Sequence, residues 1–331
     1  MTFTRRDLAR MTLAALPLAK AWADPDSRIG GVQIGVISYS FRAVTWDVDE
    51  IIKAMVRIGL NEIELMVEAV EASLGAPSLF PLSLFSGGGQ AQGNKRSEMP
   101  TAAQMAAFRA WMSGPEARKA REDLRRWRLA AAMDGFRAIR GKFDAAGIDL
   151  ALLCFNFMSP NVADDEIEYA FQLAEALGVK AITTSTLVSV SKRVAPFADK
   201  HKLMVGYHGH DDVNDPDQFA TIESFETAMS WSRYHGVNLD LGHFTAANFD
   251  AVAFIRQHHD RITNIHLKDR KKNHGPNVPW GQGDTPIVQV LQLMRREKYP
   301  FPANIEYEYQ GESDPVSEVS KCLAYCRQAL A

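Results

Sequence analysis

The sequence predicts an α/β protein, a single-domain (β/α)8 barrel, and two observations carry this prediction. Eight short apolar segments alternate along the chain with eight longer segments of helical periodicity. Helices of this length between strands imply a parallel sheet, because parallel neighbours need a long crossover connection. Eight such strand–helix pairs favour a closed barrel over an open sheet.

The strand candidates are short runs of mostly apolar residues. They are residues 32–38, 61–66, 148–154, 180–184, 203–208, 236–240, 262–266 and 303–308. The helical patterns are 48–58, a long stretch within 101–146, 164–177, 187–201, 218–235, 249–258, 286–298 and 316–330. Several helices end at glycine, as at Gly59, Gly147 and Gly178, which is the usual residue after a helix C-terminus.

An open dinucleotide-binding sheet is the main alternative fold. It requires a glycine-rich turn directly after the first strand. The first strand candidate instead runs into the segment 38–42, SYSFR, which contains no glycine. The one irregular region, residues 69–99, follows the second strand candidate, and a long loop without periodicity in a compact domain is often functional. We interpret it as a lid whose apolar residues, such as Phe80 and Phe85, cover a pocket.

The composition is that of an ordinary globular protein. Of the 331 residues, 46% are hydrophobic and 23% are charged, and the net charge is −3. This slightly acidic balance gives no reason to expect a nucleic-acid partner. The barrel is expected to occupy residues 28–331.

The N-terminus predicts a separate segment, residues 1–23. Arg5 and Arg6 precede a modest apolar stretch, residues 11–19, and Ala21-Trp22-Ala23 then provides a cleavage site. This arrangement resembles a twin-arginine export signal and predicts a periplasmic protein, and the alternative is a basic, frayed N-terminus of a cytosolic protein. The apolar stretch is too short to cross a bilayer, so no membrane insertion is expected.

Polar residues occur at the ends of the last four strand candidates. They are His208, Asp240, His266 and Glu306. The carboxyl ends of barrel strands converge on one mouth, where active sites lie. Two imidazoles and two carboxylates at one point predict a site for one divalent metal ion, Mn, Mg, Co or Zn.

Neighbouring residues extend this site. Glu308 shares a strand face with Glu306, and Lys268 shares one with His266. A salt bridge from Lys268 to a carboxylate is therefore the alternative to a metal site. His210 shares a face with His208 and is a second candidate for proton transfer.

Two loops add candidates for substrate contact. His243 follows Asp240 by three residues, although Asp240 could instead be a simple helix cap. The loop 270–285 contains Trp280, whose ring suits the apolar face of a sugar but could equally pack the loop onto the barrel.

The phrases SYSFR, IEL, YHGHD, LDLGH, HLKDR, PWGQGD and IEYE resemble the xylose-isomerase-like TIM-barrel family of sugar phosphate isomerases and epimerases, from residue 33 to the C-terminus. The resemblance implies a mouth metal bound by Asp240, His266 and Glu306, with His243 on the substrate. Further substrate contacts are expected from Glu64, Lys268, Asp269, Trp280 and Glu308. Homo-oligomers are common in this family.

The sequence departs from the family where its epimerases carry a glutamate that is both ligand and acid/base group. His208 stands at that position, so proton transfer is assigned to Glu306 with His208 or His210. The expected function is a metal-dependent isomerase or epimerase that acts on a non-phosphorylated sugar or keto-sugar through an enediolate. The alternatives are a lyase or dehydratase acting on 3-keto-glycosides, a carbohydrate-binding barrel without catalysis and, less favoured, a phosphodiesterase.

Overall fold

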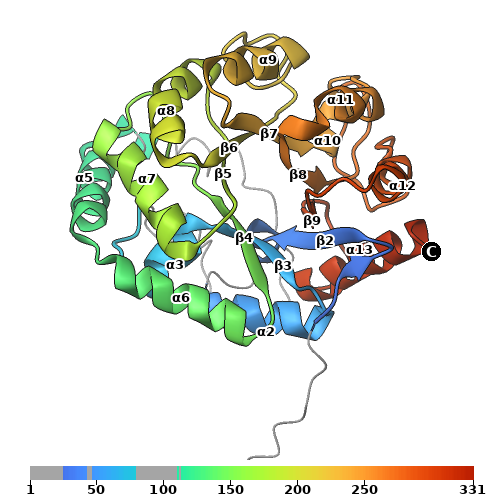
Figure 1. The fold of residues 1–331 in the computed structure, drawn as a ribbon, viewed down its shortest axis with the longest axis horizontal. Coiled ribbons are helices and arrows are strands. Elements are labelled where there is room, and N and C mark those ends of the chain that lie inside the picture. Colours follow the sequence, from blue (N-terminus) through green and yellow to red (C-terminus); the bar gives the residue numbers. More distant parts are fainter. Residues whose placement is uncertain (1–24, 43–46, 80–109, 112) are drawn as a thin grey trace, which may run out of the picture.

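The computed structural model describes residues 25–42, 47–79, 110–111 and 113–331. Its sheet follows the order β1 to β9, and an additional pairing between β2 and β9 closes the eight parallel strands β2–β9 into a barrel (Figure 1). The barrel strands are β2 Val32–Ile37, β3 Glu62–Met66, β4 Asp149–Cys154, β5 Ala181–Thr184, β6 Met204–His208, β7 His235–Asp240, β8 Ile262–Leu267 and β9 Ala303–Ile305. The predicted (β/α)8 fold is confirmed.

Helices surround the barrel (Figure 1). They are α2 Val48–Ile58, α3 Val67–Ser73, α5 Pro115–Ala130, α6 Met133–Ala145, α7 Asp164–Leu177, α8 Val188–His201, α9 Ile222–Trp231, α10 Leu241–Ala246, α11 Ala251–His258, α12 Ile287–Glu297 and α13 Pro315–Ala329, with 3-10 turns η1 Ser38–Phe41 and η3 His259–Arg261. No helix of the described residues is long and apolar enough to cross a membrane.

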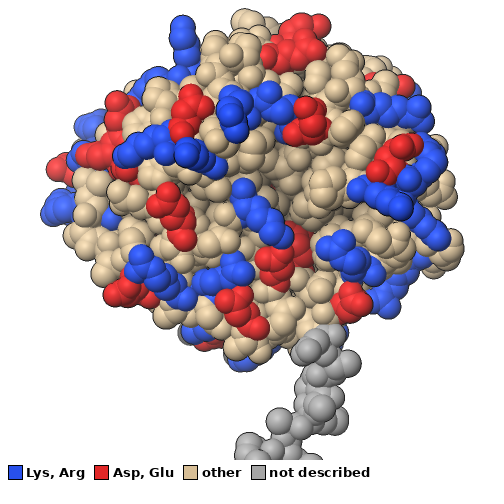
Figure 2. Space-filling model, in the orientation of Figure 1, with Lys and Arg blue, Asp and Glu red and all other residues tan. Residues whose placement is uncertain are grey.

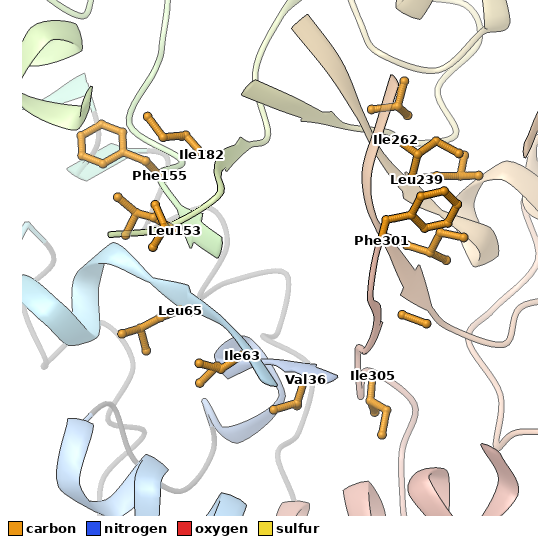
Figure 3. Packing of buried hydrophobic residues seen from close by; sticks show 14 of the residues in the cluster. Val36, Ile63, Leu65, Leu153, Phe155, Ile182, Leu239, Ile262, Phe301 and Ile305 are labelled. Atoms are coloured by element: carbon orange, nitrogen blue, oxygen red, sulfur yellow. The ribbon is translucent and has the colours of Figure 1, made fainter. Parts of the chain in front are cut away.

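The apolar core lies between the strands and the helices, while part of the barrel interior is polar. On β3, Ile63 and Leu65 belong to the main core cluster, and they alternate with the buried carboxylates Glu62 and Glu64 (Figure 3). Successive side chains of a strand point to opposite faces, so the two glutamates point into the barrel. The strands thus separate an apolar outer layer from an interior that is partly polar.

Strand register stacks polar residues in the barrel. Asp240 is paired with His266, and His266 with Asn304, which lies two residues before Glu306. His208 is paired with Asn238, two residues before Asp240. Steps of two residues keep a side chain on the same face, so all four candidate ligands point towards the interior at the carboxyl ends of their strands.

Several elements differ from the sequence-based expectations. The short strand β1 Arg28–Ile29 pairs antiparallel with β2 at the amino end of the barrel. The region 69–99 is not irregular throughout, because α3 extends to Ser73 and buries Val67, Ala69 and Val70 against the core. The final strand ends at Ile305 and not at residue 308, and α9 is shorter than the pattern 218–235. The expected lid residues 80–99 and the expected signal 1–23 lie outside the described residues.

Candidate metal centre

The structure brings the four strand-end residues together. His208, Asp240, His266 and Glu306 each offer one ligand atom, and these atoms all lie within 4.8 Å of one another. Asp240, His266 and Glu306 are buried, and His208 is partly buried. Two imidazoles and two carboxylates at this spacing are a donor set for a divalent transition metal.

His266 is held between two glutamates. Its Nδ1 lies 3.2 Å from Glu306 Oε2, and its Nε2 lies 2.6 Å from Glu64 Oε2. Burial opposes the charged imidazolium, but the two carboxylates outweigh burial and raise the pKa of His266 well above its usual value. Glu64 therefore interacts with Nε2 of His266, and Glu306 with Nδ1 on the other side of the ring.

Lys268 contacts the same carboxylates as a cation. Its Nζ lies 2.9 Å from Asp240 Oδ2, 2.8 Å from Glu306 Oε2 and 2.6 Å from Glu308 Oε2. Burial would lower the pKa of Lys268, but the three carboxylates raise it well above its usual value. Burial would raise the pKa of Glu306, but Lys268 and His266 hold it well below its usual value. Glu306 is thus an anion, and the salt bridge considered from sequence is present within the cluster.

His208 supplies the observation that tests whether a metal fits. Burial, together with the nearby His266, lowers the pKa of His208 well below its usual value, so the ring is neutral at pH 7. Among the described residues, its buried Nδ1 has no hydrogen-bond partner, and its Nε2 lies 4.0 Å from Asp240 Oδ2. A neutral, under-satisfied imidazole beside two carboxylates is suited to binding a metal ion.

A second polar group borders the cluster. His210 Nε2 lies 3.1 Å from Ser185 Oγ, and the His210 ring centroid lies 5.1 Å from that of His208. Burial, followed by His243, lowers the pKa of His210 to about 4. His243 Nδ1 lies 3.0 Å from Asp211 Oδ1, and Arg270 binds both oxygens of Asp211 at 3.0 and 3.2 Å. His210, from the loop after β6, and His243, which lies in α10 and not in the expected loop, therefore border the candidate ligand His208.

Asp269 and Trp280, which were also predicted to contact substrate, have contacts in and around the loop 270–285. Asp269 accepts hydrogen bonds from the backbone N–H groups of Gly281 and Gly283 at 2.8 and 2.9 Å, so it organises the loop 270–285. Trp280 is partly buried against the core and meets Tyr325 of α13 edge-on. The indole nitrogen of Trp280 has no hydrogen-bond partner among the described residues. Substrate contact by Asp269, Trp280 and Glu64 stays a prediction.

Sequence reasoning missed a layer of asparagines under the site. Asn238, Asn264 and Asn304 are buried, and each stands two residues before a candidate ligand. The repeated phrases NLD, NIH and NIE carried this signal, because residues two apart on a strand share a face. Ser185 and Arg270 were also missed.

Comparison with known proteins shows the family of this barrel. The family model described as xylose isomerase-like TIM barrel matches residues 101–328, more than half of the chain. The chain belongs to the xylose isomerase-like TIM barrel family. A curated relative, the L-ribulose-5-phosphate 3-epimerase UlaE of Escherichia coli O1:K1, is 23% identical over 118 residues, which cover 34% of this chain and 42% of that protein.

Solved structures share the fold at low identity. The 3-keto-D-glucoside 4-epimerase YcjR of E. coli has a TM-score of 0.58 and 10% identity, with 90% of this chain and 99% of that chain covered. The IOLI protein, whose structure contains a zinc atom, has a TM-score of 0.56 and 13% identity, with 91% and 99% covered. At these identities the likeness shows the fold alone.

Proposed function

We propose that this protein is a divalent-metal-dependent isomerase or epimerase acting on a non-phosphorylated sugar or keto-sugar through an enediolate. The observation that carries the proposal is the convergence of His208, Asp240, His266 and Glu306 at the barrel mouth. Family membership and the epimerase relative support this class of reaction. A zinc-containing structural neighbour supports a metal at such a site.

The metal, when bound, would polarise the substrate carbonyl and the neighbouring hydroxyl. Glu306 is the group best placed to move the proton on the carbon next to the carbonyl, because Lys268 and His266 keep it ionised. Its conjugate acid can return the proton to the same carbon or to its neighbour. His208 and His210 border the same space as neutral rings, and either can exchange a proton with a substrate hydroxyl.

The charges at the mouth support a substrate without phosphate. Lys268 is paired with three carboxylates, and Arg270 binds both oxygens of Asp211. Arg42 donates to the backbone carbonyls of Tyr39 and Tyr307. Each of these cations is already engaged, whereas a phosphate group needs donors that remain available to it. The N-terminal sequence supports the further proposal that the protein works in the periplasm, where free sugars and glycosides are expected substrates.

The decisive test joins metal content to proton exchange. Metal-loaded protein is incubated in deuterium oxide with a panel of neutral sugars, keto-sugars and 3-keto-glycosides, and deuterium incorporation next to the carbonyl is followed by NMR. We expect exchange that requires metal and falls at least 100-fold in Glu306→Gln, the lower end of the usual contribution of acid–base catalysis. Glu312→Gln, which changes an exposed glutamate of the same loop, is the matched control and should retain activity.

Three other results would change the assigned mechanism or function. Undiminished exchange by Glu306→Gln would remove Glu306 from the mechanism. An unsaturated product would assign the protein to the lyases. Failure of the wild-type protein to bind any of Mn, Co, Zn or Mg would refute the proposal and favour a carbohydrate-binding barrel.

A further inference from the structure

Glu64 is a buried carboxylate on β3, early in the chain, whereas the candidate ligands lie on or directly after β6 to β9. Its side chain nevertheless contacts one of these ligands, His266. Its side chain is 0% exposed, and it enters the barrel from β3. Glu64 Oε2 lies 2.6 Å from His266 Nε2, while His266 Nδ1 faces Glu306 at 3.2 Å. The two ring nitrogens of His266 thus have different partners, and only Nδ1 faces another of the candidate ligands.

Three neutral donors fix the Glu64 carboxylate. Asn264 Nδ2 donates to Oε2 at 2.8 Å, Asn238 Nδ2 donates to Oε1 at 3.3 Å, and the Thr183 hydroxyl donates to Oε1. The donors come from β5, β7 and β8, so three strands position one carboxylate. A buried carboxylate that accepts this many hydrogen bonds has little freedom to rotate.

We infer that Glu64 is a positioning residue that holds His266 in the tautomer protonated at Nε2 and thereby presents Nδ1 to a divalent metal ion. With a metal ion bound, the Nε2–H group would donate to Glu64, and Nδ1 would give up its proton and face the ion. A carboxylate in this position also increases the basicity of the ligand nitrogen. Asn238 Nδ2 also lies 3.3 Å from His266 Nε2. In this tautomer both nitrogens carry hydrogen, so the contact is not a hydrogen bond.

Glu62 provides a matched control within the same strand. It is also a buried glutamate pointing into the barrel, two residues before Glu64. Its Oε2 accepts from Asn304 Nδ2 at 2.7 Å, and Asn304 Oδ1 accepts from Asn264 Nδ2 at 3.1 Å. Glu62 therefore shares the chemistry and burial of Glu64, but it reaches His266 only through two asparagines and Glu64.

The test measures metal affinity and not turnover. Metal-free wild type, Glu64→Gln and Glu62→Gln are titrated with Co²⁺ or Zn²⁺ in competition with a metallochromic chelator. We expect Glu64→Gln to bind about 10- to 100-fold more weakly than wild type, as is typical when the partner of a metal-ligating histidine is lost. Glu62→Gln should bind within a factor of about three of wild type. The visible spectrum of bound Co²⁺ should change in Glu64→Gln only, which a purely structural role in the barrel would not produce.

A milder variant guards against loss of folding. Thr183→Val removes one hydrogen bond to Glu64, at a cost of about 1 kcal/mol, and should weaken metal binding about fivefold if that loss is transmitted to His266. This inference rests on the proposed metal site. Different results would refute the proposed function and the positioning role of Glu64. A wild-type protein that binds no metal refutes the proposed function. A wild-type protein that binds metal, with Glu64→Gln or a folded Thr183→Val binding equally well, refutes the positioning role alone.

Discussion

Lys268 lies against three carboxylates, and two of them, Asp240 and Glu306, are candidate metal ligands. From the sequence, a salt bridge to Lys268 and a metal site were competing interpretations of the same residues. The structure contains the salt bridge at the proposed site, so the proposed metal ion would bind beside the Lys268 ammonium group. An ammonium group beside ligand carboxylates offsets their mutual repulsion and allows this many acids to be buried together.

The ligand residues could be predicted from sequence because each ends a recognisable strand at the mouth. The residues that support them could not be predicted as easily. Glu64 and His266 are 202 positions apart, and only closure of the barrel brings β3 and β8 to the same interior. Sequence patterns reveal which face a side chain takes, but they do not give distances across a barrel.

Glu68 supports a prediction about pH. This residue of α3 lies in a largely buried position, and its Oε2 has no hydrogen-bond partner among the described residues. Burial raises its pKa to about 7 from the usual 4.5. The folded state therefore binds more protons than the unfolded state between pH 4.5 and 7, so this group makes the protein less stable as pH rises through that window.

Glu68→Gln removes the titrating group. We expect the variant to be more stable than wild type at pH 8, by up to about 3 kcal/mol, and the difference to shrink towards pH 5. Urea unfolding of both proteins between pH 5 and 8 measures this difference. Glu50→Gln, at an exposed position of α2, should follow the wild-type pH dependence. A stability difference that does not vary with pH would contradict the assigned titration.

At the scale of elements, strands were predicted more accurately than helices. The barrel strands are short runs of mostly apolar residues, and seven of the eight end within one residue of the expected position. The helices α3 and α10 follow their strands without a loop, so no turn residue marked their beginning. The last strand was predicted too long because pairing with β8 ends at Ile305, although the apolar and aromatic pattern continues.

Gly35 of β2 lies where the barrel interior leaves no room for a side chain. A Cβ atom added at Gly35 would lie 1.5 Å from Glu62 Oε2 and 2.6 Å from Asn304 Nδ2, both inside the barrel. We expect Gly35→Ala to destabilise the protein by about 1–3 kcal/mol or more, because the polar column must shift to make room. Gly141 in α6 is the matched control, since it is exposed and a Cβ there would meet nothing within 4 Å.

Gly141→Ala should stabilise the protein by up to about 1 kcal/mol, because alanine is the better helix former. Chemical denaturation of the two variants beside wild type measures both effects. Equal stability of Gly35→Ala and wild type would show that the barrel interior around Glu62 is not tightly packed.

At the scale of the whole molecule, closure of the barrel is what gathers the site. The candidate ligands lie on or directly after β6, β7, β8 and β9, and β9 is held on its other side by β2 at the opposite end of the sequence. The outer surface does not suggest a second charged site on the face that is shown, where acidic and basic side chains are interspersed (Figure 2). Sequence predicted the closed fold because eight strand–helix pairs leave few other arrangements.

Metal binding should therefore stabilise the entire barrel. His208 and Glu306 are nearly 100 residues apart, so the unfolded chain has no preformed site and the metal binds essentially to the native state. With free metal at about 1,000 times its Kd, the expected gain is about 4 kcal/mol. At about 2 °C per kcal/mol for a large domain, this raises Tm by roughly 8 °C. Thermal unfolding with added Mn²⁺ or Zn²⁺, and again after chelation, measures the shift. His266→Ala should show little of it, and an equal shift in that variant would place the metal elsewhere.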